Sequence, residues 1–331
     1  MRDKIAGALY GMALGDAIRG CAELWGRKRV KAFFGRIEGF LDGPAENDVA
    51  FNYKKGQFTD DTGQALVLLD SIESTDYEPD TRDIALRMLA WAEKENAFEN
   101  NILGPTSKVA LANFRDNIQD SRITDKALSN GSAMRIAPIG CLFRPEQKED
   151  IARYVYLVSR ATHTSDVTIA GAAMIAEAVS SAIVKDDFEK VMEDVFGIEE
   201  IGYGMGCETF SPRLGERLRI GLDIAGSYKG DDEGFIHKLY DVVGTGVGII
   251  ESVPAALSVA YYAQDPNLSC LLCANMAGDT DTIGAMATAV CGAFTGMGRI
   301  KPEYIRTLRQ QNDADFDHYI RILEKGRERF A

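Results

Sequence analysis

The chain has 331 residues, of which 46% are hydrophobic and 26% are charged, a composition that supports a sizeable buried core. Its formal net charge of −13 repels phosphodiester backbones, which argues against non-specific binding of nucleic acids. No uninterrupted apolar stretch reaches the ~18 residues that a membrane span needs, so we expect no membrane partner.

Helical periodicity dominates the chain, and convincing alternating β-patterns are nearly absent. Residues 1–18 begin like a signal peptide, but three glycines interrupt the apolar run and we expect an amphipathic first helix instead. The less regular stretches are 26–58, 97–130 and 197–212. We therefore predict an all-α protein, a compact orthogonal multi-helix bundle of about a dozen helices in which residues 1–331 form a single domain. The predicted helices cover 3–17, 60–74, 81–96, 131–143, 148–161, 165–183, 185–195, 213–226, 250–263, 281–296 and 314–328.

The six cysteines are scattered and form no disulfide framework, which favours a reducing, cytoplasmic compartment. Cys270 and Cys273 make a lone CxxC pair. A zinc site would need a second pair or nearby histidines, and the chain has three histidines in all. We interpret the pair as thiols on a buried helix face.

Two short acidic motifs stand at predicted helix starts, "TDDT" at 59–62 and "DTDT" at 279–282. Each motif by itself is a good helix N-cap, because Thr and Asp side chains accept hydrogen bonds from the free N–H groups of a first turn. One cap needs one oxygen, however, whereas each motif supplies two carboxylates and two hydroxyls. The surplus carboxylates would repel one another unless a cation lies between them.

Carboxylate and hydroxyl oxygens are ligands of hard cations, and neither motif contains Cys or His. The motifs therefore favour Mg²⁺, Mn²⁺ or Ca²⁺ over zinc. Two motifs suit a two-metal site, in which the ions lie ~3.5–4 Å apart. We predict that each motif supplies half of one shared cluster, with the two helix starts side by side.

Other motifs accompany these two along the chain: "GALYGMALGDAIRGCAE" (7–23), "SNGSAMRIAPIG" (129–140), "ATHTSDVTIAGA" (161–172) and "GTGVGIIESVPAAL" (244–257). Together, and in this order, they resemble the ADP-ribosylglycohydrolases, a family that includes the enzyme that reactivates dinitrogenase reductase. The resemblance covers most of the chain. It implies an all-α fold of the ADP-ribosylglycohydrolase type, a pair of Mg²⁺ or Mn²⁺ ions, and hydrolysis of the glycosidic bond at ribose C1 in ADP-ribosylated proteins or related metabolites.

The resemblance also implies roles for individual residues. Glu23 would be a catalytic residue close to the metals, and Asp60 and Asp281 would orient the attacking water. Asn130, Gly131 and Ser132 would line the substrate loop, and His163 would approach the ribose or its leaving group. The metal ligands would be Thr59, Asp60, Asp61, Asp279, Asp281 and Thr282, with Thr62 and Thr280 as framework residues.

Each role has a plainer structural alternative. Glu23 could be a solvated side chain, His163 a helix-entry residue that bonds locally, and Asn130 with Gly131 an ordinary turn. Arg135 could simply pair with an acid. The sequence leaves these alternatives open.

Some positions depart from the family pattern. Many relatives have Gly before the Asn and small residues ahead of it, whereas this chain has Lys126, Ala127, Leu128 and Ser129, and Arg19 and Cys21 also replace smaller residues. Lys126 could add a charge to a diphosphate held by backbone N–H groups, or the substrate could lack a diphosphate. Two alternatives therefore remain: an N-ribosyl hydrolase of a small nucleoside-like metabolite, and a non-catalytic, crystallin-like family member, against which the intact acidic motifs argue.

Overall fold

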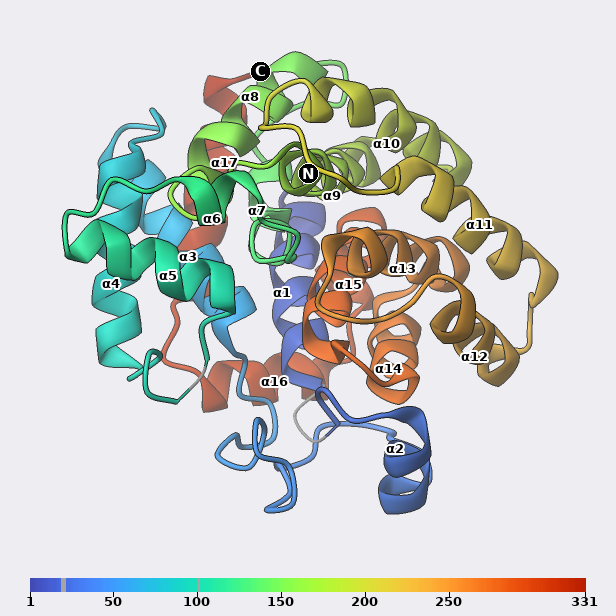
Figure 1. The fold of residues 1–331 in the computed structure, drawn as a ribbon. Helices are drawn as coiled ribbons and strands as arrows, with labels where there is room; N and C mark the ends of the chain where they lie inside the picture. Colours follow the sequence, from blue (N-terminus) through green and yellow to red (C-terminus); the bar gives the residue numbers. More distant parts are fainter. Residues whose placement is uncertain (19–21, 101) are drawn as a thin grey trace.

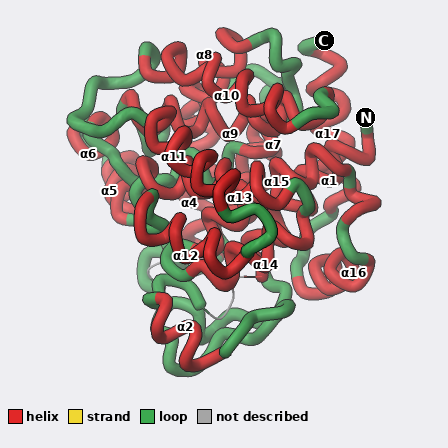
Figure 2. The backbone as a smooth tube through the Cα atoms, turned by 90° about the vertical axis from the view of Figure 1, so that its right-hand side faces the viewer, coloured by secondary structure: helices red, strands yellow, loops and turns green. Residues whose placement is uncertain are grey.

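Helices form nearly all of the regular structure in the computed structural model, which describes residues 1–18, 22–100 and 102–331 (Figure 2). Within these ranges β-type pairing is limited to two isolated bridges, Ser129 with Gly248 and Ser165 with Cys207. The prediction of an all-α fold is therefore confirmed. Arg19 and Cys21 lie outside the described residues.

The described residues contain seventeen α-helices and one short 3-10 helix, more than the dozen that the sequence suggested. The helices are α1 (Arg2–Ile18), α2 (Arg27–Phe34), α3 (Asp60–Ser74), α4 (Thr81–Lys94), α5 (Pro105–Arg115), α6 (Arg122–Asp125), α7 (Ala137–Gly140), α8 (Lys148–Ser159), α9 (Asp166–Val184), α10 (Phe188–Tyr203), α11 (Leu214–Ser227), α12 (Asp232–Val242), α13 (Ile249–Ala263), α14 (Pro266–Met276), α15 (Thr280–Thr295), η1 (Met297–Arg299), α16 (Pro302–Gln311) and α17 (Phe316–Arg329).

Three helices, α1, α9 and α15, lie in the middle of the molecule with the others around them (Figure 1). Their small and apolar residues are buried along almost their whole length. Among the described residues, α9 is the one helix long and apolar enough to cross a membrane, but 94% of its apolar window is buried inside the protein. That burial identifies α9 as a core helix.

Glycines on facing sides let α1 and α15 pack with their backbones in contact. A Cβ added at Gly7 would lie 2.1 Å from the carbonyl oxygen of Gly292, and one at Gly15 would lie 1.9 Å from that of Gly284. The start of α1 thus faces the end of α15, so the two helices run antiparallel. This packing places the end of α1 beside the start of α15, where the second acidic motif begins.

The predicted helix over 131–143 is wrong for most of its length. Residues 130–135 form turns, and only Ala137–Gly140 are helical. The backbone here is paired with a distant loop: the N–H of Asn130 donates to the carbonyl of Val247, 3.1 Å away. Pro138 also has no N–H to give to a continuous helix, so a new helical turn begins around it. Tertiary contacts therefore override the local helical pattern.

Helix α10 is longer than the predicted 185–195. It begins after Asp187, whose side chain accepts from the N–H of Glu189, and it continues to Tyr203. The sequence suggested an irregular stretch over 197–212, which includes Gly202, but a Cβ at Gly202 would lie 2.6 Å from the Cα of Ala170. Gly202 therefore permits close packing of α10 on α9. The prediction also missed several shorter helices: α2, α5, α6, α12, α14 and α16.

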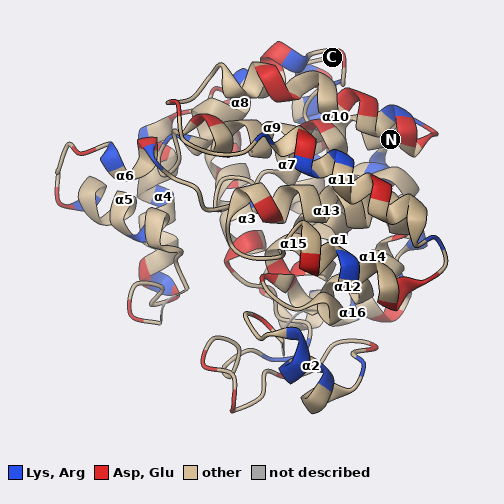
Figure 3. Cartoon of the chain, turned by 45° about the vertical axis from the view of Figure 1, so that its right-hand side comes forward, with Lys and Arg blue, Asp and Glu red and all other residues tan. Residues whose placement is uncertain are grey.

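Basic residues gather on α2, whereas acidic residues are spread over many helices (Figure 3). Two ion pairs hold α2 to α12: Arg27 with Asp241 at 3.3 Å, and Lys31 with Glu233 at 2.5 Å. These pairs help to anchor the segment that follows Glu23. Away from this region, Cys270 and Cys273 are fully buried in α14, and burial raises the pKa of both thiols.

Candidate active site

Both acidic motifs stand at the start of a helix, as expected. Asp60 is the first residue of α3, and Thr280 is the first residue of α15. The residues just before them, Thr59 and Asp279, make no side-chain hydrogen bond to the free N–H groups of their helices. Simple helix capping therefore does not explain the two motifs.

Asp16, near the end of α1, takes the capping role at α3 instead. Its buried carboxylate accepts from the backbone N–H groups of Thr59 and Thr62 at 3.0 Å. It also accepts from their hydroxyls, at 2.8 and 2.6 Å. Negative charge is favourable at a helix N-terminus, so Asp16 ties the first motif to α1. Sequence reasoning missed this role, and the available signal was a carboxylate at the end of an otherwise apolar helix.

Backbone pairing places Glu23 beside the second motif. The N–H of Leu24 donates to the carbonyl of Gly278 at 2.8 Å, and the N–H of Gly278 donates to the carbonyl of Trp25 at 3.2 Å. The side chain of Asn47 donates to the carbonyl of Glu23 at 3.0 Å. Glu23 is therefore a largely buried residue held against the start of α15, and the solvated-surface alternative does not describe it.

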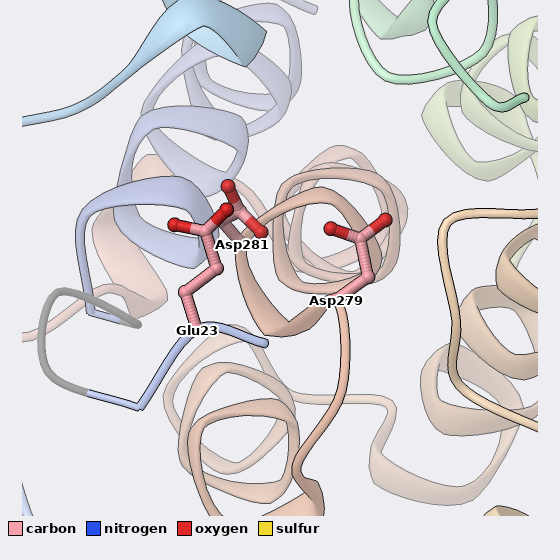
Figure 4. A group of neighbouring side chains, drawn as sticks. All are labelled: Glu23, Asp279 and Asp281. Atoms are coloured by element: carbon pink, nitrogen blue, oxygen red, sulfur yellow. The ribbon is translucent and has the colours of Figure 1, made fainter. Parts of the chain in front are cut away.

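Three carboxylates converge at this point. Glu23, Asp279 and Asp281 each offer an oxygen, and these oxygens all lie within 4.8 Å of one another. Figure 4 shows the carboxylate of Glu23 next to that of Asp281, with Asp279 beside them where the chain enters α15. Asp60 and Thr282 line the same cavity. The structure thus brings residues of both motifs together.

Asp61 lies close to this cluster and is buried from solvent. Its Oδ2 lies 3.3 Å from the hydroxyl of Thr59, whose hydrogen goes to the closer Asp16, while its Oδ1 has no hydrogen-bond partner among the described residues. Burial and then the charges of Asp281 and Asp16 raise the pKa of Asp61 well above its usual range. Burial and the charge of Asp281 likewise raise the pKa of Asp279.

Crowded, buried carboxylates of this kind need a compensating positive charge. The donor set consists of carboxylate and hydroxyl oxygens, which suit Mg²⁺ or Mn²⁺. The buried oxygen of Asp61 that lacks a hydrogen-bond partner adds an acceptor that a cation would satisfy. The residues present therefore fit a divalent-cation site.

The loop at 130–132 meets this cluster in different ways at its three residues. The Asn130 side chain donates to Oδ2 of Asp279 at 2.6 Å, which fixes the orientation of that carboxylate. Gly131 lines the cavity, and a Cβ there would lie 2.8 Å from the ring of His163. Ser132 is fully buried and donates to the carbonyl of Thr168 at 3.0 Å. Ser129, which the sequence did not single out as a site residue, lines the cavity instead.

His163 is fully buried behind this loop and is not among the described residues that line the cavity. Its Nδ1 lies 2.9 Å from the hydroxyl of Thr162, and its Nε2 lies 3.1 Å from the hydroxyl of Ser129. Burial, and then the charge of Arg135, lowers the pKa of His163 to about 3. His163 is therefore a neutral imidazole at physiological pH, one side chain removed from the cavity.

The cavity itself has a volume of about 470 Å³, within the usual range for small-molecule sites. Besides the acidic residues, the first turn of α5 contributes Ser107 and Lys108 to its wall. The sequence predicted no regular structure for this region, and neither Ser107 nor Lys108 was expected to have a function. Lys126, the predicted phosphate contact, is exposed after α6 and is not among the described lining residues.

Comparisons with known proteins identify the family of the chain. The family model described as ADP-ribosylglycohydrolase matches residues 1–329. "Uncharacterized protein YegU" of Escherichia coli (strain K12) is 43% identical over 98% of this chain and 98% of its own length. "ADP-ribosylarginine hydrolase Tri1" of Pseudomonas putida (strain GB-1) is 26% identical over 92% of this chain and 73% of its own length. A solved "ADP-ribosylglycohydrolase-related protein complex" shares the fold, with a TM-score of 0.72 at 22% identity over 98% of both chains. The chain therefore belongs to the ADP-ribosylglycohydrolase family and is a glycosidic-bond hydrolase.

Proposed function

We propose that this enzyme cleaves the bond at ribose C1 in an ADP-ribosylated protein or another ADP-ribosyl compound, with two divalent cations at the acidic cluster. The observation that carries the proposal is that a group of carboxylates and a lysine at a helix start share one cavity. Glu23, Asp60 and Asp281 line it together with Ser107 and Lys108. Carboxylates suit the ribose end of the substrate, where positive charge develops as the bond breaks. A lysine and helix N–H groups suit the phosphates.

The cation ligands in this proposal come from the starts of two helices. Mg²⁺ or Mn²⁺ bound there supplies Lewis-acid charge and lowers the pKa of bound water. Oxygens of Glu23, Asp279 and Asp281 all lie within 4.8 Å of one another, so Glu23 can contribute an oxygen as well. The ligands are Thr59, Asp60 and Asp61 from α3 and Asp279, Asp281 and Thr282 from α15.

The remaining chemistry belongs to side chains at the cavity wall. Asp60 and Asp281 orient the water that attacks C1, and their charge favours the oxocarbenium-like transition state. Glu23 transfers a proton or positions the ribose from its anchored place beside Gly278. Proton transfer by a positioned carboxyl group typically contributes ~10²–10⁴-fold to the rate. Asn130 keeps Asp279 in a fixed orientation throughout.

The substrate is proposed to carry a diphosphate. Lys108 is the lysine among the described lining residues, and its Nζ donates to the carbonyl of Phe98, which holds the side chain at the wall. A nucleoside has no phosphate that this lysine could contact. ADP-ribosyl-arginine is the compound to test first, because Tri1 is named as a hydrolase of ADP-ribosylarginine.

A kinetic comparison tests this proposal. We expect kcat/KM to be higher for ADP-ribosyl-arginine than for a simple nucleoside, with Mn²⁺ or Mg²⁺ present. Lys108→Ala should raise KM for the ADP-ribosyl compound by about tenfold, the loss of one bond to a charged group. Lys126→Ala removes an equal charge outside the cavity and is the matched control. A better nucleoside substrate together with a silent Lys108→Ala would instead identify a ribosidase of small metabolites.

A further inference from the structure

A chain of buried hydrogen bonds leads from Asp60 through the protein interior. Oδ2 of Asp60 accepts from the amide of Gln64 at 3.3 Å. The amide oxygen of Gln64 accepts from Arg135 at 2.8 Å, and the other terminal nitrogen of Arg135 donates to the hydroxyl of Thr162 at 2.6 Å. Arg135 is fully buried, and neither of these bonds goes to a carboxylate. Among the described residues Arg135 therefore makes no direct ion pair with an acid, although the charge of Asp60 acts on it from a distance.

The chain continues from Thr162 to the cavity. The hydroxyl of Thr162 lies 2.9 Å from Nδ1 of His163, and Nε2 of His163 lies 3.1 Å from the hydroxyl of Ser129. Ser129 in turn lies 3.0 Å from the hydroxyl of Thr106 and lines the cavity. The interior between Asp60 and Ser129, two residues of the same cavity wall, is thus bridged by hydrogen bonds without a break.

Arg135 sets the direction of these bonds because a guanidinium donates and never accepts. The Thr162 oxygen must accept from it, and among the described residues the only acceptor for the Thr162 hydrogen is Nδ1 of His163. His163 is neutral, so with Nδ1 accepting, its proton lies on Nε2 and is donated to Ser129. The hydrogen of Ser129 then points away from His163, toward either the hydroxyl of Thr106 at 3.0 Å or the cavity that Ser129 lines.

Arg135 also fixes the orientation of Gln64, at the end of the series that leads to Asp60. Because the amide oxygen of Gln64 is occupied by Arg135, its nitrogen must face Asp60. Asp60 therefore always meets a donor, which suits an ionised carboxylate. Burying a guanidinium without a carboxylate partner is costly, and its Nε has no hydrogen-bond partner in the described residues. A function of Arg135 in orienting both ends of this series of hydrogen bonds would explain why the protein tolerates that cost.

We propose that Arg135 is a positioning residue that fixes the direction of this hydrogen-bond chain, so that His163 donates from Nε2 and Ser129 presents its hydroxyl hydrogen to an acceptor oxygen of the substrate. The proposal rests on the proposed function only in its last step, the contact between Ser129 and substrate. The ligand class is an oxygen acceptor such as a phosphate or a ribose hydroxyl. Ser129 thereby becomes a specificity residue, and Thr162 and His163 act through it.

The tautomer of His163 can be read directly by ¹⁵N NMR, because the chain has three histidines. Variants at His237 and His318, which lie on α12 and α17, assign the other two signals. We expect the Nε2–H tautomer of His163 in wild type at pH 7. Thr162→Val removes the hydroxyl that links Arg135 to His163 while nearly keeping the side-chain shape, and it should abolish the fixed tautomer. Thr162→Ser restores the hydroxyl and should restore the wild-type spectrum.

Kinetics tests whether the orientation reaches the substrate. Thr162→Val and Ser129→Ala should each raise KM by about tenfold with kcat within twofold of wild type, and Thr162→Ser should not. Because Thr162 acts through Ser129, adding Thr162→Val to Ser129→Ala should cause no further rise. Additive effects, an Nδ1–H tautomer in wild type, or an unchanged spectrum in Thr162→Val would overturn the proposal. The spectrum needs no substrate, so a wrong substrate and a wrong bond direction give different results.

Discussion

Replacing Asp16 by asparagine is expected to destabilise the fold by about 3 kcal/mol. Asp16 accepts from two backbone N–H groups and two hydroxyls at distances between 2.6 and 3.0 Å. A hydrogen bond to a charged group contributes ~1.5–3 kcal/mol, against ~1 kcal/mol for a neutral one. An asparagine oxygen has two lone pairs and can keep two of these donors without the charge, which loses about 1 kcal/mol for each. The bonds to the other donors are lost, which brings the total to at least about 3 kcal/mol.

Relief of charge repulsion opposes this loss but is the smaller effect. The charge of Asp16 contributes to the raised pKa of Asp61 only after burial and Asp281. Asp16→Asn should also lower kcat by at least about tenfold, because the turn that it holds carries Asp60 and Asp61, and small misplacements of catalytic groups are costly.

Urea unfolding and steady-state kinetics measure both effects. Asp80→Asn is the matched control, since Asp80 caps α4 at an exposed site and accepts from the N–H groups of Arg82 and Asp83. Asparagine is nearly as good an N-cap as aspartate, so this variant should change stability by less than about 0.5 kcal/mol. An Asp16→Asn protein with wild-type stability and activity would refute the role of Asp16 in holding the start of α3.

Three further predictions follow from the packing and the buried charges. Gly15→Ala places a Cβ 1.9 Å from the Gly284 carbonyl oxygen and should cost about 1–3 kcal/mol or more in urea unfolding, whereas Gly26→Ala, with no neighbouring atom within 4 Å, should be nearly neutral. Burial raises the pKa of Glu177 from 4.5 to about 7, so the folded state favours the protonated carboxyl group. The contribution of this group to the free energy of unfolding is therefore complete below pH 4.5 and is lost as the pH rises through 7. The free energy of unfolding of Glu177→Gln, relative to that of wild type, should therefore increase by up to about 3 kcal/mol from pH 5 to pH 8. A difference between the two proteins that does not change with pH would contradict this. Glu23→Gln should lower kcat by ~10²-fold and also weaken cation binding in calorimetry, because Glu23 lies within the carboxylate cluster. Unchanged kcat would remove Glu23 from the catalytic role.

The sequence predicted the long helices and the meeting of the acidic motifs because both leave local signals. A long run of apolar residues at helical spacing indicates a helix such as α9, and an unusual density of carboxylates indicates a shared cation site. The single-domain organisation and the cytoplasmic location remain predictions.

What the sequence missed depends on contacts between distant residues. The turns around Asn130 arise from pairing with Val247, and the capping of α3 comes from Asp16 on another helix. Lys108 reaches the cavity through the fold of a stretch with weak periodicity, whereas Lys126 is close to the motif in sequence but lies outside the cavity. Proximity along the chain was a poor guide to which lysine lines the cavity.

The proposed activity is cation-dependent cleavage of an ADP-ribosyl bond. The most direct measurement is the release of free ADP-ribose from ADP-ribosyl-arginine by protein that has been stripped with a chelator, before and after Mn²⁺ or Mg²⁺ is added. We predict no release from the stripped protein, recovery when either ion is added, and failure of recovery in Asp281→Asn. Equal release with and without chelator, or no release under any condition, would contradict the account.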